Sequence, residues 1–250
     1  MTWSEMQPLL SDACLDTLFM VGWSTVYAVL GGLPLGVLLV LTDRGGLLQN
    51  VMLNKVVGAV VNVGRSLPFF ILMIVLIPLC RVLIGTSIGP SAAVVPLAIG
   101  AVPFFARLVE TAIREVDHGL VEAAQSMGGG TWTIVLKVLL PQALPPIVAG
   151  LTTTVIALIG YSAMAGSIGG GGLGNLAYVY GYQRFETGLM LVTVVLLIVI
   201  VSAVQLLGDL AVRQLSRRGS SRSAPPVRLR LPWSGRAAGD AEALALGKTS

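Results

Sequence analysis

Charged residues are scarce in this sequence, and their scarcity excludes a water-soluble globular domain. Only 11% of the 250 residues are charged, whereas soluble domains carry about 25%. Aromatic residues are also few, at 6%, while 55% of the chain is hydrophobic and the mean hydropathy is +0.86. Thirty glycines and thirteen prolines lie among these apolar segments, a mixture that is typical of membrane helices. The composition therefore predicts an all-α integral membrane protein.

The residue types that carry most metal and catalytic chemistry are nearly absent. His118 is the only histidine, which excludes a His-rich metal site and argues against a histidine-based catalytic triad. Cys14 and Cys80 are the only cysteines, and both lie in or beside apolar runs, as small buried hydrophobic residues do. We therefore expect no catalytic residue, no metal site and no disulfide scaffold.

Two glycine-containing segments resemble nucleotide-binding motifs but lack the required context. Residues 169–174 have the G-x-G-x-x-G spacing, yet a predicted membrane helix precedes them where the motif needs a strand. We expect a flexible turn at the outer end of that helix. Residues 247–249 end like a phosphate-binding loop, but Glu242 stands where its first glycine belongs. Basic residues are not interleaved with aromatics, so we expect neither a bound nucleotide cofactor nor a nucleic-acid partner.

Five uncharged runs are long enough to cross a hydrocarbon core of roughly 30 Å, which takes about 20 helical residues. The predicted spans cover approximately residues 17–41, 67–84, 90–112, 147–168 and 187–210. Residues 56–64 are predicted to form a helix that enters at the interface. The third span continues through Arg107, Glu110 and Arg114, whose spacing allows ion pairs along one helix face.

The distribution of basic residues predicts the orientation of the spans. With the N-terminus outside and the C-terminus in the cytoplasm, the cytoplasmic side holds more basic residues near span ends (Arg44, Lys55, Arg114, Lys137, Arg213, Arg217, Arg218) than the outside (Arg81, Arg184). We expect Arg65 near the cytoplasmic entrance of the second span, where it reaches the interface. The spans form one membrane domain over 1–218. The basic tail, 219–250, is predicted to be disordered and to form a solvated extension, with contact between its arginines and membrane lipid as the alternative.

The longest internal cytoplasmic segment, 117–145, is predicted to form two short helices rather than coil. Asp117 can cap the first helix, and the glycines 128–130 stop it. The second helix runs from Trp132 to Leu140, and Pro141 is expected to end it. A segment that only joined two spans would need few residues, so this one is predicted to dock a partner.

These residues resemble a known family. Glu122-Ala123-Ala124, three residues, Gly128, nine residues and Val138-Leu139-Leu140-Pro141 are similar to the E-A-A-x3-G-x9-I-x-L-P signature of binding-protein-dependent ABC importer permeases. Val138 replaces the usual isoleucine, a conservative change for packing. Segments 65–69, 85–89 and 160–164 resemble the methionine-importer permeases of this superfamily, and the resemblance extends over about Thr17 to Arg218.

The resemblance implies the type I ABC importer permease fold and a multi-pass subunit of the bacterial inner membrane. Its partners would be a second copy of the chain, two cytoplasmic ABC ATPase subunits that bind ATP and magnesium, and an external methionine-binding protein or lipoprotein. The implied substrate is D- or L-methionine, with another amino acid as the alternative. In the family, the helix that holds Glu122, Ala123, Ala124 and Gly128 is the coupling helix, which contacts the ATPase. The small alanines allow close approach, Glu122 offers an acceptor, and Gly128 permits a sharp exit.

The fourth span is our candidate for the transport gate. Tyr161, Ser162 and Met164 lie toward its outer end among small residues, which allow helices to approach closely in a bilayer. A methionine among them is a flexible apolar plug, and Met164 is therefore the gate candidate, with tight packing as the alternative role.

Three further function classes make different demands on the sequence. An intramembrane enzyme would need a base near Ser66, Ser162 or Ser167, and the sequence offers none; a passive channel would conduct without nucleotide. An ion-coupled carrier needs acids at membrane depth, and between the span ends only Glu110 is available, flanked by two arginines. The driving energy is therefore expected to come from outside the chain.

Overall fold

The computed structural model describes residues 3–220 and is helical throughout that range. The elements are α1 (Trp3–Thr42), α2 (Val51–Ser66), α3 (Phe69–Val75), α4 (Ile77–Ile84), α5 (Pro90–Arg114), α6 (His118–Ser126), α7 (Thr131–Ile134), the π-helix η1 (Val135–Leu139), α8 (Leu140–Ser167), α9 (Gly172–Leu176), the π-helix η2 (Ala177–Gln183) and α10 (Thr187–Ser220). The predicted tail lies outside the described residues except for its first two positions.

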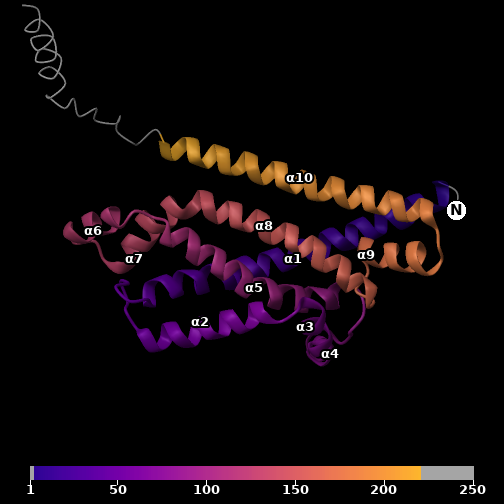
Figure 1. Cartoon of the computed structure of the whole chain (residues 1–250), viewed down its shortest axis with the longest axis horizontal. Helices are drawn as coiled ribbons and strands as arrows, with labels where there is room; N and C mark the ends of the chain where they lie inside the picture. The colour runs from indigo at the N-terminus through magenta and orange to yellow at the C-terminus, as the bar shows by residue number, and fades with distance from the viewer. Residues whose placement is uncertain (1–2, 221–250) are drawn as a thin grey trace, which may run out of the picture. The chain divides into compact units, whose positions relative to one another are not determined.

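The long helices α1, α5, α8 and α10 lie side by side along one axis (Figure 1). One end of this bundle carries α6 and α7, and we call it the α6 end. The opposite end carries α9, and we call it the α9 end. Within the described residues, four helices are long and apolar enough to cross a membrane, and the bent pair of α2 and α3 makes a fifth if it counts as one span.

The second predicted span differs most from the structure. In place of an interfacial helix followed by one span, α2 and α3 form a broken pair that bends by 101°. Leu67 precedes Pro68 and is extended, with ψ 126°, because a residue before proline is pushed out of the helical region. The break therefore falls at the Leu67–Pro68 step. In Figure 1, α2 runs beside α1 and ends about halfway along it.

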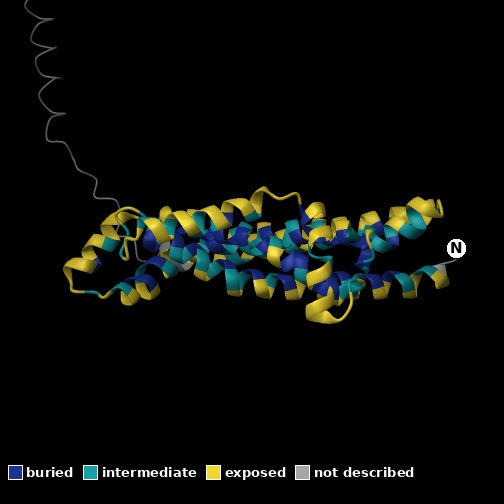
Figure 2. Ribbon diagram, turned by 90° about the horizontal axis from the view of Figure 1, so that it is seen from below, coloured by how far each residue is buried: buried dark blue, intermediate teal, exposed yellow. Residues whose placement is uncertain are grey.

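The buried residues form a band along the middle of the bundle, and the outer faces are exposed (Figure 2). The central helix α5 contributes several small side chains to this band, among them Ala93, Ala101 and Ala106. Small side chains let helices approach closely where no hydrophobic effect drives them together. Exposed apolar side chains on α10, such as Leu191, Val195 and Ile198, suit a surface that faces lipid.

The turn at the α9 end is tightly packed, which corrects the flexible turn predicted from residues 169–174. A side-chain carbon at Gly166 would lie 2.3 Å from the backbone nitrogen of Asn175, and one at Gly174 would lie 2.3 Å from the carbonyl oxygen of Ala163. Only glycine allows α8 and α9 to meet this closely. The N–H of Leu173 donates to the buried Thr17 hydroxyl at 2.9 Å, which fixes the turn to α1.

Candidate coupling surface and transport path

Helix α6 has the ends that the sequence predicts. The Asp117 carboxylate accepts a hydrogen bond from the N–H of Gly119 at 2.8 Å, so the predicted cap is confirmed. Gly128 follows the helix with φ +78°, a left-handed conformation that favours glycine. The N–H of Gly129 then donates to the carbonyl of Ala124 at 3.0 Å and closes the helix. The helix is thus a short rigid unit at the α6 end of the bundle.

The four signature residues of α6 and its exit do not share one face. Glu122, Ala123 and Gly128 are exposed, whereas Ala124 is buried in a cluster with Ile134, Val135 and Leu139. Ala124 therefore allows α6 to approach its own chain, and Glu122 and Ala123 are the residues available to a partner.

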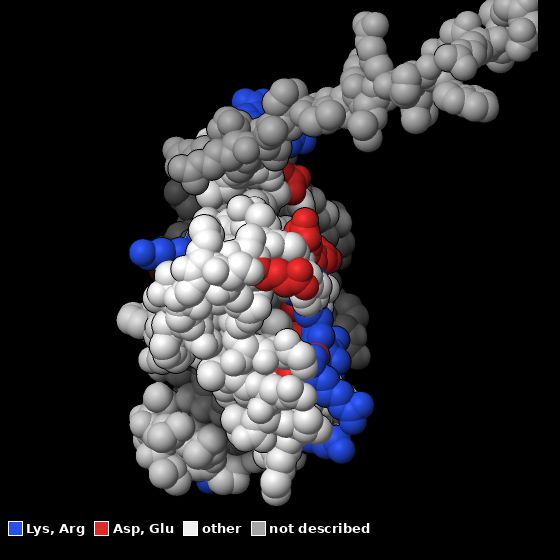
Figure 3. Space-filling view, turned by 90° about the vertical axis from the view of Figure 1, so that its left-hand side faces the viewer, with Lys and Arg blue, Asp and Glu red and all other residues white. Residues whose placement is uncertain are grey.

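The surface around this helix exposes large apolar side chains. Met127 is 82% exposed, and Trp132, Leu136 and Leu120 are exposed as well. Viewed from the α6 end, the surface is largely uncharged, and most of the charged side chains in view gather along one edge (Figure 3). Outside a bilayer, such an apolar patch marks an interaction surface. We call Leu120, Met127, Trp132 and Leu136 the apolar patch.

Pro141 does not end the second helix of this segment, which corrects the prediction. The chain is helical without interruption from Thr131 to Ser167 and passes through η1 into α8. Proline lacks an N–H donor, and it is accommodated here because it stands at the start of α8, directly after the wider π-helical turn. Pro141 therefore belongs to the junction between the coupling segment and the span, and the segment 131–145 is part of one long helix.

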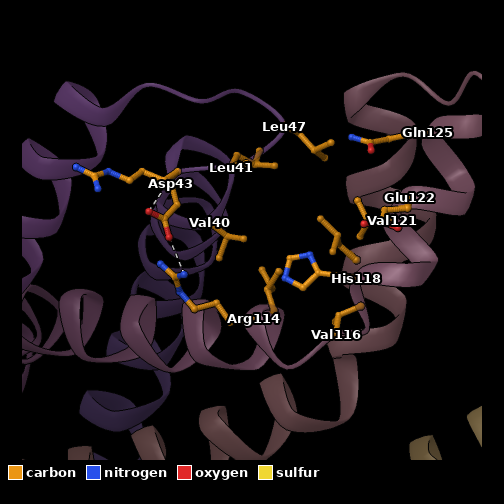
Figure 4. A pocket seen from close by; sticks show the side chains of 15 residues that line it. Val40, Leu41, Asp43, Leu47, Arg114, Val116, His118, Val121, Glu122 and Gln125 are labelled. Atoms are coloured by element: carbon orange, nitrogen blue, oxygen red, sulfur yellow. Dashed lines mark hydrogen bonds and ion pairs between the residues drawn. The ribbon is translucent and has the colours of Figure 1, made fainter.

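A cavity of about 350 Å³ separates α6 from the segment that follows α1 (Figure 4). His118, Glu122 and Gln125 line it from the α6 side, and Asp43 lines it from the other. Asp43 Oδ2 lies 2.7 Å from Arg114 Nη1. The N–H of Arg44, which donates to Asp43 Oδ1 at 2.8 Å, and the Arg114 guanidinium lower the pKa of the Asp43 carboxyl below its ordinary value.

The ion pairs predicted within α5 are confirmed. Glu110, buried at 4% exposure, accepts from Arg107 at 2.5 Å and from Arg114 at 2.8 Å. Arg114 therefore joins Glu110 on its own helix to Asp43 at the end of α1. The sequence does not predict the ion pair between Asp43 and Arg114, because no local spacing relates these two residues.

The three gate candidates occupy different environments on α8. Met164 is 44% exposed. Tyr161 is half-buried, and its ring stacks on that of Phe69 with centroids 4.5 Å apart. Ser162 is buried, and its hydroxyl donates to the carbonyl of Ile159 at 2.8 Å. Tyr161 and Met164 are thus accessible in this conformation and Ser162 is not. Phe69 was not singled out in the sequence, since only the packing of α3 on α8 brings it to Tyr161.

Among the residues that the structure describes, no group of three His, Cys, Asp or Glu side chains could hold a metal ion.

Comparison with known proteins identifies the family. A family model described as the binding-protein-dependent transport system inner membrane component matches residues 32–220. The chain is 52% identical over 210 residues to the probable D-methionine transport system permease protein MetI of Vibrio cholerae, over 84% of this chain and 93% of that protein. It is 49% identical over 207 residues to the methionine import system permease protein MetP of Bacillus subtilis, over 83% and 93% of the two chains.

A solved structure agrees with these relatives. A chain in an inward-facing structure of the MetNI methionine ABC transporter superposes with a TM-score of 0.83 at 46% identity, over 86% of this chain and 99% of that chain. This chain is a non-catalytic membrane subunit with the type I ABC importer permease fold. It belongs to the family of binding-protein-dependent transport system inner membrane components.

Proposed function

We propose that this chain is the permease subunit of an ATP-driven importer that carries D- or L-methionine from an external binding protein into the cytoplasm. The names of its relatives support this substrate, and another amino acid is the alternative. In the working transporter, two copies of the chain join two ATPase subunits, which bind ATP and magnesium.

The apolar patch at the α6 end carries the proposal. Its exposed side chains lie on and after α6, the helix that exposes Glu122 and Ala123. Because α6 is capped at both ends and packs on the bundle through Ala124, a force applied to it is transmitted to the bundle. The second half of the coupling segment is continuous with α8 through Pro141. A displacement of this segment by an ATPase therefore moves the helix that holds the gate candidates.

The gate, in this proposal, is formed by Met164 and Tyr161, and it opens and closes as ATP binding and release shift a two-state equilibrium. The exposure of Met164 supports its placement on a surface between two copies of the chain. Ser162 then has a supporting role, since its hydroxyl bonds within α8, a contact that often bends helices.

A photocrosslinker placed at two equally exposed positions tests the docking. Met127 and Phe185 are both 82% exposed, but Met127 lies at the α6 end and Phe185 lies between η2 and α10 at the α9 end. In cells that also express the ATPase and binding protein from the same gene neighbourhood, position 127 should crosslink to the ATPase and position 185 should not. Equal crosslinking at both positions, or none at 127, would refute the docking surface.

Uptake of radiolabelled methionine tests the substrate. A strain without its own methionine importer should accumulate label only when the permease, ATPase and binding protein are all present. Competition by unlabelled D-methionine, L-methionine and other amino acids then ranks the substrates. Efficient competition by a different amino acid, with none by either methionine, would replace the proposed substrate with the alternative.

A further inference from the structure

The break between α2 and α3 encloses a cavity that the proposed function does not use. Its volume is about 190 Å³, and four elements line it: α2, α3, α5 and α8. A cavity of this volume holds about six water molecules. It can therefore accommodate much of a small molecule but not a peptide. We call it the α2–α3 cavity.

The α2–α3 cavity lies beside the middle of α5, and it is open on the side of Arg65 and Leu67, which are exposed. Gly64, which lines it, packs against Pro103, since a side-chain carbon at Gly64 would lie 2.8 Å from the Pro103 ring. Pro103 is near the middle of α5, roughly 16 Å along the helix axis from Arg114. The neighbouring Arg65 is therefore level with the middle of α5.

A charged side chain at this depth needs a reason. An arginine at the centre of a membrane helix costs about 2.5 to 3.5 kcal/mol on insertion scales, and such residues face a bundle interior or a water-filled cavity. Arg65 lines the α2–α3 cavity, and it forms no ion pair with any residue that the structure describes. Arg107 and Arg114, on the central helix α5, do have carboxylate partners. Arg65 thus presents an uncompensated cation to the cavity.

The remaining walls of the cavity are largely apolar and combine three aromatic rings with leucines and glycines. Phe69 and Tyr161 stack with their ring planes 11° apart, and Phe104 adds a third ring from α5. Aromatic rings make favourable contacts with apolar chains and with a thioether sulfur. A guanidinium fork binds a carboxylate through two parallel hydrogen bonds. One cavity thus combines a carboxylate binder with an apolar wall, which are the two features that recognise an α-amino acid with a hydrophobic side chain.

We propose that the α2–α3 cavity binds the transported amino acid during its passage, with Arg65 holding the carboxylate and the rings of Phe69 and Tyr161 contacting the side chain. This inference rests on the proposed function, because it requires an amino acid as the cargo. A lipid phosphate is a poorer match, since headgroups lie at the bilayer surface and the cavity lies near mid-depth. Binding here gives the permease a selective step of its own, after release from the binding protein.

The test is equilibrium binding of radiolabelled L-methionine to the purified permease–ATPase complex in nanodiscs, without binding protein. Arg65→Gln should lower the affinity for L-methionine about ten- to a hundred-fold, as expected for the loss of charge-assisted hydrogen bonds. The affinity of Arg65→Lys should fall between those of the wild type and Arg65→Gln, because lysine keeps the positive charge but cannot make the two parallel hydrogen bonds of a guanidinium. Arg81→Gln is the matched control, since Arg81 also lies in the last turn of a short helix but outside the cavity, and it should leave binding unchanged.

A second measurement leaves the protein unaltered. Methionine amide lacks the negative carboxylate, so it should compete at least ten-fold less well than methionine for the wild-type complex, and Arg65→Gln should abolish this preference. Equal competition by the amide in the wild type, or unchanged methionine binding by Arg65→Gln, would overturn the inference. If Arg65→Gln does not assemble, the amide comparison on the wild type decides alone.

The uptake experiment separates this inference from the proposed function. A wild-type transporter that imports methionine but shows no Arg65-dependent binding refutes only the cavity site. A complete wild-type transporter that takes up no methionine refutes the proposed substrate itself.

Discussion

Replacing Gly128 with alanine is the sharpest test of the coupling helix, because the structure isolates one physical effect. A side-chain carbon at Gly128 would meet no other atom within 4 Å, so alanine introduces no clash. The residue nevertheless has φ +78°, where an L-residue costs about 1 to 2 kcal/mol. Within this chain, the effect of Gly128→Ala is therefore backbone strain at the exit of α6.

Gly130, in the same connection, supplies the control. It is also open within 4 Å, but its φ is −70°, which alanine adopts freely. Gly130→Ala should be neutral or slightly stabilising, while Gly128→Ala shifts the equilibrium against the native exit by about 5- to 30-fold. Gly128→Asn should recover part of the loss, since asparagine tolerates the left-handed conformation.

The assay is ATP hydrolysis stimulated by the binding protein, measured together with methionine uptake in proteoliposomes. We expect Gly128→Ala to reduce uptake per ATP hydrolysed several-fold, with Gly130→Ala indistinguishable from the wild type. Identical coupling in the two alanine variants would refute the reasoning, because both positions are open and only Gly128 has a positive φ.

Three further predictions concern the bundle. Gly166→Ala should lower the melting temperature strongly, because its new carbon would lie 2.3 Å from rigid backbone. Gly160→Ala should not, because no atom lies within 4 Å of the added carbon there. Equal melting temperatures for the two variants would contradict the close approach. Glu110→Ala should cost about 2 kcal/mol in unfolding free energy, since Glu110 accepts from two guanidiniums, and an unchanged thermal unfolding curve would disprove this. Asp43→Asn should destabilise by less than about 1 kcal/mol, because Arg114 is 47% exposed. The pKa of Asp43 is lowered, so this contribution is present above the ordinary carboxyl pKa and lost as the pH falls through the lowered value; a difference between Asp43→Asn and wild type that persists in denaturation at pH 2 would contradict it.

Features encoded in local spacing could be predicted from the sequence alone. The helical membrane class follows from composition, because a chain with so few charges can satisfy its backbone groups in lipid only by forming helices or barrels. The Asp117 cap, the Gly128 stop and the ion pairs of Glu110 each join residues within one helical turn or two. Such contacts depend on the identity of neighbours in the chain, which the sequence states directly.

Features that join distant segments were decided only by the tertiary structure. The pairing of Asp43 with Arg114, the stacking of Phe69 on Tyr161 and the depth of Arg65 depend on how whole helices pack, and helix packing reflects many small side-chain contacts at once. Pro141 illustrates the same limit, since a π-helical turn lets the helix continue through a residue that ordinarily stops it. The sequence by itself thus determined the helical membrane class and the ends of α6, whereas packing decided which residues meet between helices, because no local period relates them.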